Sequence, residues 1–160
     1  PRAAIDFAPP PPELTGCHLS DAVVRAAAGG TVTRSRSSGV VVDLDGDGFE
    51  GSGWTHVYSH LAATGRIAVG EEVERGDPLG FPSCEGGLPT VSRVAFSRRY
   101  NGEWVPVDSA AAPLVLGGWT ASAGEESRQG WLTHPSLGPR EATPAKEPTV
   151  NGVAAVPGTG

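Results

Sequence analysis

The chain has 160 residues, a length that suits one domain able to bury a core. Its 23 glycines and 15 prolines stand between short Val-rich runs, which is typical of a turn-rich β domain. The net charge of −6 and the lack of a basic stripe argue against nucleic-acid binding. No segment of the sequence approaches the ~20 apolar residues of a membrane-spanning helix.

The first predicted segment, residues 1–22, is rich in proline. Its run from Pro9 to Pro12 cannot be helical and predicts a stiff polyproline stretch. Residues 20–28 are the one place where helical periodicity is visible.

The pattern of the second segment, residues 23–108, predicts short strands separated by glycine turns. Residues 30–35 and 39–44 predict a hairpin, and residues 54–61 predict a third strand. Residues 69–80 have the glycine spacing of short strands that turn a corner. The predicted fold class is therefore all-β.

A second hairpin is predicted from residues 91–99 and 104–107, because Asn101-Gly102 between them is a strong type I′ turn signal. The third segment, residues 109–134, holds two weaker strand candidates and is expected to pack on the core as an extension. They are residues 113–119, a possible edge strand, and residues 130–133. Residues 135–160 are mostly Pro, Ala, Gly and Thr, and predict an extended, irregular tail.

The two cysteines, Cys17 and Cys84, lie far apart and neither belongs to a CxxC motif. In an exported protein they would pair, and closing so long a loop would stabilise the fold by roughly 4 kcal/mol. The alternative is two buried free thiols.

An acidic run, Asp43-Leu44-Asp45-Gly46-Asp47-Gly48, predicts a possible calcium loop between two strands. Its carboxylates stand at alternate positions, followed by a glycine for a sharp turn, and Glu50 could complete the ligand shell. Trp54 occupies the position where an EF-hand has Glu, so this is not an EF-hand. The alternative is an ordinary solvated hairpin loop, since Asp and Gly favour such turns.

Several segments, in this order and spacing, make the chain resemble the lysostaphin/LasA-type (LytM) zinc metalloendopeptidases: residues 5–7, 26–32, 58–61, 84–87 and 100–102. The resemblance covers residues 4–107. It implies a lysostaphin-type, duplicated-hybrid-motif-like antiparallel sheet with a groove, and the cleavage of bacterial cell-wall peptides by a zinc-activated water.

The same resemblance assigns a role to individual positions. Asp6 takes the place of a zinc-ligating Asp, whose partner His would lie upstream of residue 1. His60 takes the place of an assisting His, with Tyr58 beside it on the same strand face. The family's His-x-His pair falls on Arg93 and Ala95, so a ligand and a catalytic His are replaced. Ala95 has no donor atom, and the permanent charge of Arg93 would repel zinc.

The sequence therefore favours an exported, cell-surface module of this fold that lacks zinc and peptidase activity and serves for binding or assembly. Its partner would be a cell-wall peptide, another protein or copies of the chain itself. The alternative is an active zinc endopeptidase with a ligand His upstream of residue 1. A third hypothesis is a structural protein stabilised by calcium at the acidic run.

Overall fold

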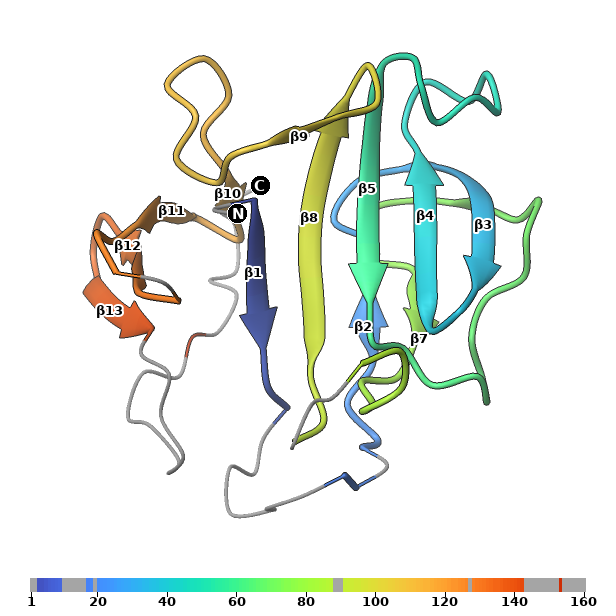
Figure 1. Cartoon of the computed structure of the whole chain (residues 1–160), viewed down its shortest axis with the longest axis horizontal. Coiled ribbons are helices and arrows are strands. Elements are labelled where there is room, and N and C mark those ends of the chain that lie inside the picture. Colours follow the sequence, from blue (N-terminus) through green and yellow to red (C-terminus); the bar gives the residue numbers. More distant parts are fainter. Residues whose placement is uncertain are drawn as a thin grey trace. The chain divides into compact units, whose positions relative to one another are not determined.

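A computed structural model describes residues 3–9, 17–18, 20–87, 91–126, 128–142 and 153. The chain divides into two compact units, one of Ala4–Val105 and one of Pro1–Ala3 with Pro106–Gly160. Both are built from strands, turns and loops, and the described residues contain no helix (Figure 1). The predicted all-β class is confirmed. Within the described ranges, nothing helical is long and apolar enough to cross a membrane.

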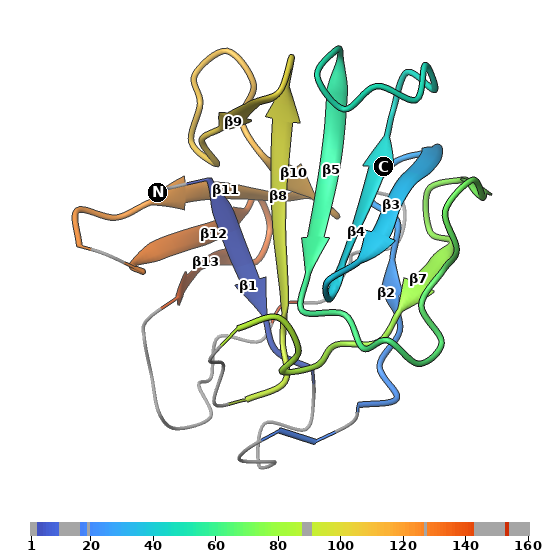
Figure 2. The same cartoon turned by 45° about the vertical axis from the view of Figure 1, so that its right-hand side comes forward.

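The unit Ala4–Val105 has a main antiparallel sheet in the order β1-β8-β5-β4-β3-β6, with β9 paired to β8. Figure 2 shows the longer strands of this sheet side by side. A separate two-stranded sheet pairs β2 with β7. The strands are β1 Ala4–Phe7, β2 Val24–Arg25, β3 Gly30–Arg36, β4 Gly39–Asp43, β5 Trp54–Ser59, β6 Glu72–Val73, β7 Pro78–Gly80, β8 Val94–Tyr100 and β9 Glu103–Val105.

Both predicted hairpins are confirmed, and their turns explain them. Ser37 and Ser38 join β3 to β4 with φ of 50° and 63°. Asn101 and Gly102 join β8 to β9 with φ of 48° and 79°. Positive φ at both central residues is the type I′ geometry, whose twist matches that of the strands. Asn101 also accepts a hydrogen bond from Gly53 N at 2.9 Å, which holds this turn against the preceding loop.

One face of the main sheet packs into the hydrophobic core of this unit. Paired residues in an antiparallel ladder project to the same face, and Val40, Tyr58 and Phe96 form one such row. All three are at most 3% exposed, and the rings of Tyr58 and Phe96 lie 5.1 Å apart. The hydrogen bond from Ala27 N to the Tyr58 hydroxyl, 2.8 Å, joins the segment after β2 to this face.

The expectation of a short helix within residues 20–28 is wrong. Val24 and Arg25 form β2 instead, and Ala26 exchanges backbone hydrogen bonds with Gly76 and Asp77. Long-range pairing has overridden a weak local preference. The predicted disulfide is confirmed, with the Cα atoms of Cys17 and Cys84 5.6 Å apart. The predicted polyproline run lies, apart from Pro9, outside the described residues.

The second unit contains a four-stranded antiparallel sheet in the order β10-β11-β12-β13. Leu114, Trp119, Ala121 and Leu132 are buried within it. Its strands are β10 Val115–Leu116, β11 Trp119–Ala123, β12 Gly130–His134 and β13 Gly138–Ala142.

The predicted tail begins too early at residue 135, because β13 lies inside it and pairs with β12 along its whole length. The strand β13 contains Pro139, which has no backbone N–H. Pro139 is tolerated because β13 is the edge strand of its sheet, where a missing N–H costs no ladder hydrogen bond.

Removing the disulfide is expected to lower the free energy of unfolding by about 2–4 kcal/mol. The bridge joins residues 67 positions apart and so restricts the unfolded chain. Urea unfolding of Cys17→Ser/Cys84→Ser beside the oxidised wild type checks this. Reduced wild type is the control and should unfold with the double variant. Equal stability of the variant and the oxidised protein would contradict the prediction.

Candidate functional site

The open face of the main sheet carries the residues singled out by the sequence. Two of them, Ala95 and Asp6, stand in one row of the ladder. This row crosses the sheet and has small side chains in the middle: Arg36, Gly39, Ser59, Ala95 and Asp6. Since the neighbouring row of Tyr58 and Phe96 faces the core, this row projects to the opposite side.

Asp6 and Ala95 are direct partners between β1 and β8. Arg93, just before β8, places its Nη1 3.5 Å from Asp6 Oδ2. The structure therefore brings together the three residues that the sequence related to the zinc site. Their chemistry does not fit zinc, because the carboxylate already faces a guanidinium and its partner position has only a methyl group. In the described part of the chain, neither Asp6 nor His60 belongs to a group of three metal-ligating side chains.

His60 lies beyond the end of β5 and is half-buried. Its φ of 67° is in the left-handed region, so the alternation of side chains is broken at this residue. Its Nδ1 is 2.7 Å from the carbonyl oxygen of Glu85 and must carry the proton, since a carbonyl only accepts. Ser83 N donates to His60 O, and Arg93 N donates to Ser83 O, so two backbone hydrogen bonds through Ser83 connect His60 to Arg93.

The expectation that Tyr58 and His60 share the open face is wrong. Tyr58 is 3% exposed on the core face, and its hydroxyl is engaged by Ala27 N. Burial raises the pKa of Tyr58 to about 12, so it stays protonated. Tyr58 is thus a packing residue. The two-residue spacing placed Tyr58 and His60 on one strand face only if the strand continued through His60, and the left-handed backbone of His60 ends it.

His56 also lies on the core face, with its ring 5.1 Å from that of Phe96. Burial, and secondarily the charge of Arg98, lowers the pKa of His56 to about 4. It is therefore neutral and enclosed, as expected of a core histidine rather than a metal ligand on the open face.

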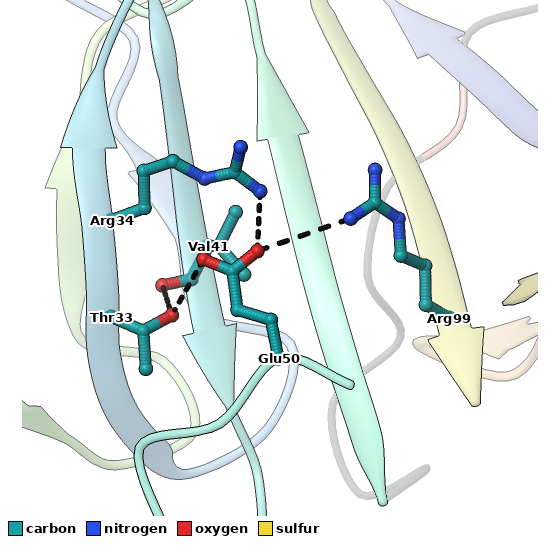
Figure 3. Close-up of polar contacts among 5 residues, drawn as sticks. All are labelled: Thr33, Arg34, Val41, Glu50 and Arg99. Atoms are coloured by element: carbon teal, nitrogen blue, oxygen red, sulfur yellow. Dashed lines mark hydrogen bonds and ion pairs between the residues drawn. The ribbon is translucent and has the colours of Figure 1, made fainter. Parts of the chain in front are cut away.

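A polar bridge across the open face was not predicted from the sequence. Glu50, from the loop after β4, binds Arg34 of β3 at 2.5 Å and also contacts Arg99 of β8 at 3.9 Å (Figure 3). Its other carboxylate oxygen accepts from the Thr33 hydroxyl at 3.2 Å. Val41, drawn with them, is 3% exposed on the sheet below.

This bridge joins two arginines that the sequence does not relate to each other. No local pattern could have paired them, because Arg34 and Arg99 lie 65 positions apart and meet only through the sheet order. Beside the bridge lies a hollow of about 470 Å³, lined by Thr33, Arg34, Ser35, Arg36, Glu50 and Val69.

The acidic run forms a compact cluster in the loop between β4 and β5. Oxygen atoms of Asp43, Asp45 and Asp47 lie within 4.8 Å of one another. Burial raises the pKa of Asp43, opposed by a hydrogen bond from Gly48 N and reinforced by the nearby charges of Asp45 and Asp47. The sequence suggested Glu50 as a further ligand, but Glu50 lies outside this cluster, because its carboxylate is paired with the arginines.

The sequence matches no protein-family model and no curated protein. Its fold is similar to that of solved M23 peptidase structures. The M23 metalloprotease pseudoalterin, from the deep sea, has a TM-score of 0.69 and 21% identity, over 89% of this chain and 80% of that one. At this identity the likeness concerns the fold, and it confirms the lysostaphin-type resemblance at that level.

Two further structures have lower scores. A mutant catalytic domain of the prophage-encoded M23 protein EnpA from Enterococcus faecalis has a TM-score of 0.49 and 23% identity, over 69% of this chain and 78% of that one. The antimicrobial peptidase lysostaphin from Staphylococcus simulans has a TM-score of 0.48 and 14% identity, over 96% and 88%.

The free energy of unfolding is expected to fall as the pH drops from about 6.5 to about 4. His56 takes up a proton at 6.5 when unfolded but only at about 4 when folded, so acid favours the unfolded chain. The loss is about 3 kcal/mol, complete below pH 4 and absent above pH 6.5. Urea unfolding at several pH values measures it, and His56→Leu should flatten the wild-type slope across this window. An equal slope in the variant would assign the effect to other groups.

Proposed function

We propose that the chain is a lysostaphin-type module that has lost zinc-dependent peptide hydrolysis and binds a cell-wall peptide on the open face of its main sheet. One observation carries the proposal: Asp6 is paired with Arg93, 3.5 Å away, and stands opposite Ala95 in the ladder. The M23 metalloprotease fold of the neighbouring structure supports the descent from a peptidase.

Catalytic zinc needs three protein ligands and an open fourth position. Here the site offers one carboxylate, and a guanidinium already neutralises it. A dication would have to displace Arg93 from Asp6 and would then meet a fixed positive charge at close range. Without the metal, nothing at Asp6 can make water nucleophilic or polarise a peptide carbonyl, so binding is the activity that these residues support.

The row that crosses the open face suits a short extended peptide. Arg36 stands at its β3 end, and Arg93 with Asp6 at its β1 end, while Gly39, Ser59 and Ala95 have small side chains between them. Four strand spacings separate β3 from β1, or about 19 Å, which is the length of about six extended residues. A peptide with a free carboxylate at one end could pair with an arginine while its backbone crosses the small residues.

The Cys17–Cys84 bridge supports a location outside the cytoplasm, because disulfides persist in oxidising compartments. A cell-surface module with an accessible peptide-binding face is consistent with that environment.

Sedimentation with insoluble peptidoglycan tests the binding function. We expect the chain to be retained, and Arg93→Ala to weaken retention about tenfold, as for loss of one charged hydrogen-bonding group. Arg75→Ala is the matched control, since Arg75 is exposed in the turn before β7, and it should bind as wild type. No soluble peptide should be released, with or without added zinc.

Other results would lead to the alternatives. Stoichiometric zinc with release of wall peptides would identify an active endopeptidase. No retention, together with concentration-dependent association of the chain, would favour self-assembly. No retention and no self-association would leave a protein partner.

Restoring two histidines is expected to create a metal site. Arg93→His/Ala95→His removes the repelling charge and sets two imidazoles beside Asp6, so zinc affinity should rise at least tenfold over wild type. Thr120→His/Ser122→His, on the exposed face of β11, is the control for a histidine pair without a carboxylate partner. Equal affinity of the two variants would contradict the placement of Asp6 in a former zinc site. Zinc titration calorimetry measures all three proteins.

A further inference from the structure

A buried carboxylate oxygen in the loop after β4 has no partner. Asp43 is 0% exposed, and its Oδ2 accepts a hydrogen bond from Gly48 N at 2.9 Å. Its Oδ1 is also buried and receives none. Thr55, opposite Asp43 in the ladder, is 0% exposed and its hydroxyl is likewise unpartnered. Buried oxygens without a donor are costly, and an anionic one calls for a cation.

The surrounding atoms have the dimensions of a cation site. The oxygens of Asp43, Asp45 and Asp47 lie within 4.8 Å of one another. Two ligands on opposite sides of a calcium ion, each at 2.3–2.6 Å, are separated by about 5 Å, so all three carboxylates can reach one ion. Hard oxygen donors in a loop suit Ca²⁺ better than Zn²⁺.

Among the described residues, the ion pairs leave the three carboxylates of the cluster without an arginine partner. They join Arg34 and Arg99 to Glu50 and Arg93 to Asp6, and none involves Asp43, Asp45 or Asp47. The cluster therefore holds three like charges, one of them buried, without a counter-charge from the ion pairs seen in this part of the chain.

We propose that Asp43, Asp45 and Asp47 bind one Ca²⁺ ion, and that this ion fixes the loop of residues 44–53 against the main sheet. Asp43 anchors the ion to the end of β4. Asp47 is tied to the loop itself, because its carboxylate accepts from Phe49 N at 2.7 Å and from the Ser52 hydroxyl at 2.6 Å.

Fixing this loop also affects Glu50, which follows the acidic cluster in the same loop. The Glu50 carboxylate lies between Arg34 and Arg99 (Figure 3). An ion that fixes the loop therefore stabilises this bridge without contacting it. The position of the Asp45 carboxylate requires a glycine at residue 53, because a Cβ there would lie 2.0 Å from Asp45 Oδ2. This inference stands apart from the proposed binding function and holds or fails independently of it.

The test uses CaCl2 on the whole chain after treatment with EDTA. We expect saturable binding of one Ca²⁺ with a dissociation constant of about 10⁻⁵–10⁻³ M, as in extracellular calcium modules. The melting temperature should rise by about 3–10 °C at 10 mM CaCl2. MgCl2 should give a smaller rise, because Mg²⁺ needs stricter octahedral geometry.

Three variants make the test specific. Asp45→Asn should keep its melting temperature without calcium, since one of three like charges is lost, but should weaken binding at least tenfold. Asp21→Asn, an exposed carboxyl before β2, is the matched control and should respond as wild type. Glu50→Gln should still bind calcium, because Glu50 is held by arginines and is not a ligand.

The inference is overturned by any of three results. These are no saturable binding up to 10 mM CaCl2, a wild-type calcium response in Asp45→Asn, or an equal loss in Asp21→Asn. If Glu50→Gln abolishes binding, the assigned ligand set is wrong. Slower amide exchange at Gly48 and Gly53 with calcium would confirm that the ion orders this loop, and unchanged exchange would contradict that role.

Discussion

The register between β5 and β8 is the constraint on which the rest of the first unit depends. Tyr58 faces Phe96 and Ser59 faces Ala95, so every second residue of both strands enters the core. A slip by one residue would place Ser59 and Ala95 inside and expose two aromatic rings. The packed rings of Tyr58 and Phe96, together with the hydrogen bond from Ala27 N, make that slip costly.

With this register set, the open face acquires its chemistry from chain segments far apart in the sequence. Ala95 is placed opposite Asp6 of the first strand, and Arg93 reaches the same carboxylate. On the other side, the loop after β4 carries Glu50 to arginines of two non-adjacent strands. On this face, arginine–carboxylate ion pairs occupy both the Asp6 position and the region around Glu50.

The sequence predicted features that depend on local chemistry. The hairpins followed from their turns, and the Asn101-Gly102 turn has positive φ at both residues. Apart from the Cys17–Cys84 disulfide, which was predicted, several features that depend on distant partners were missed. The left-handed backbone of His60 cannot be read from its neighbours, and it ended the alternation used to place Tyr58. The strand β13 was also missed, because its pairing with β12 and its position at the edge, where Pro139 is tolerated, are properties of the sheet and not of single residues.

The sequence by itself determined the all-β class and the resemblance to a peptidase family, and it predicted that Arg93 and Ala95 replace two of that family's positions. These are matters of residue identity, turn chemistry and spacing. Tertiary structure alone decided that Arg93 pairs with Asp6 and that Tyr58 belongs to the core. It also decided that Glu50 forms ion pairs with arginines rather than joining the acidic cluster. The physical reason is that charges and hydrogen bonds act over a few ångströms in space, and strand pairing sets those distances.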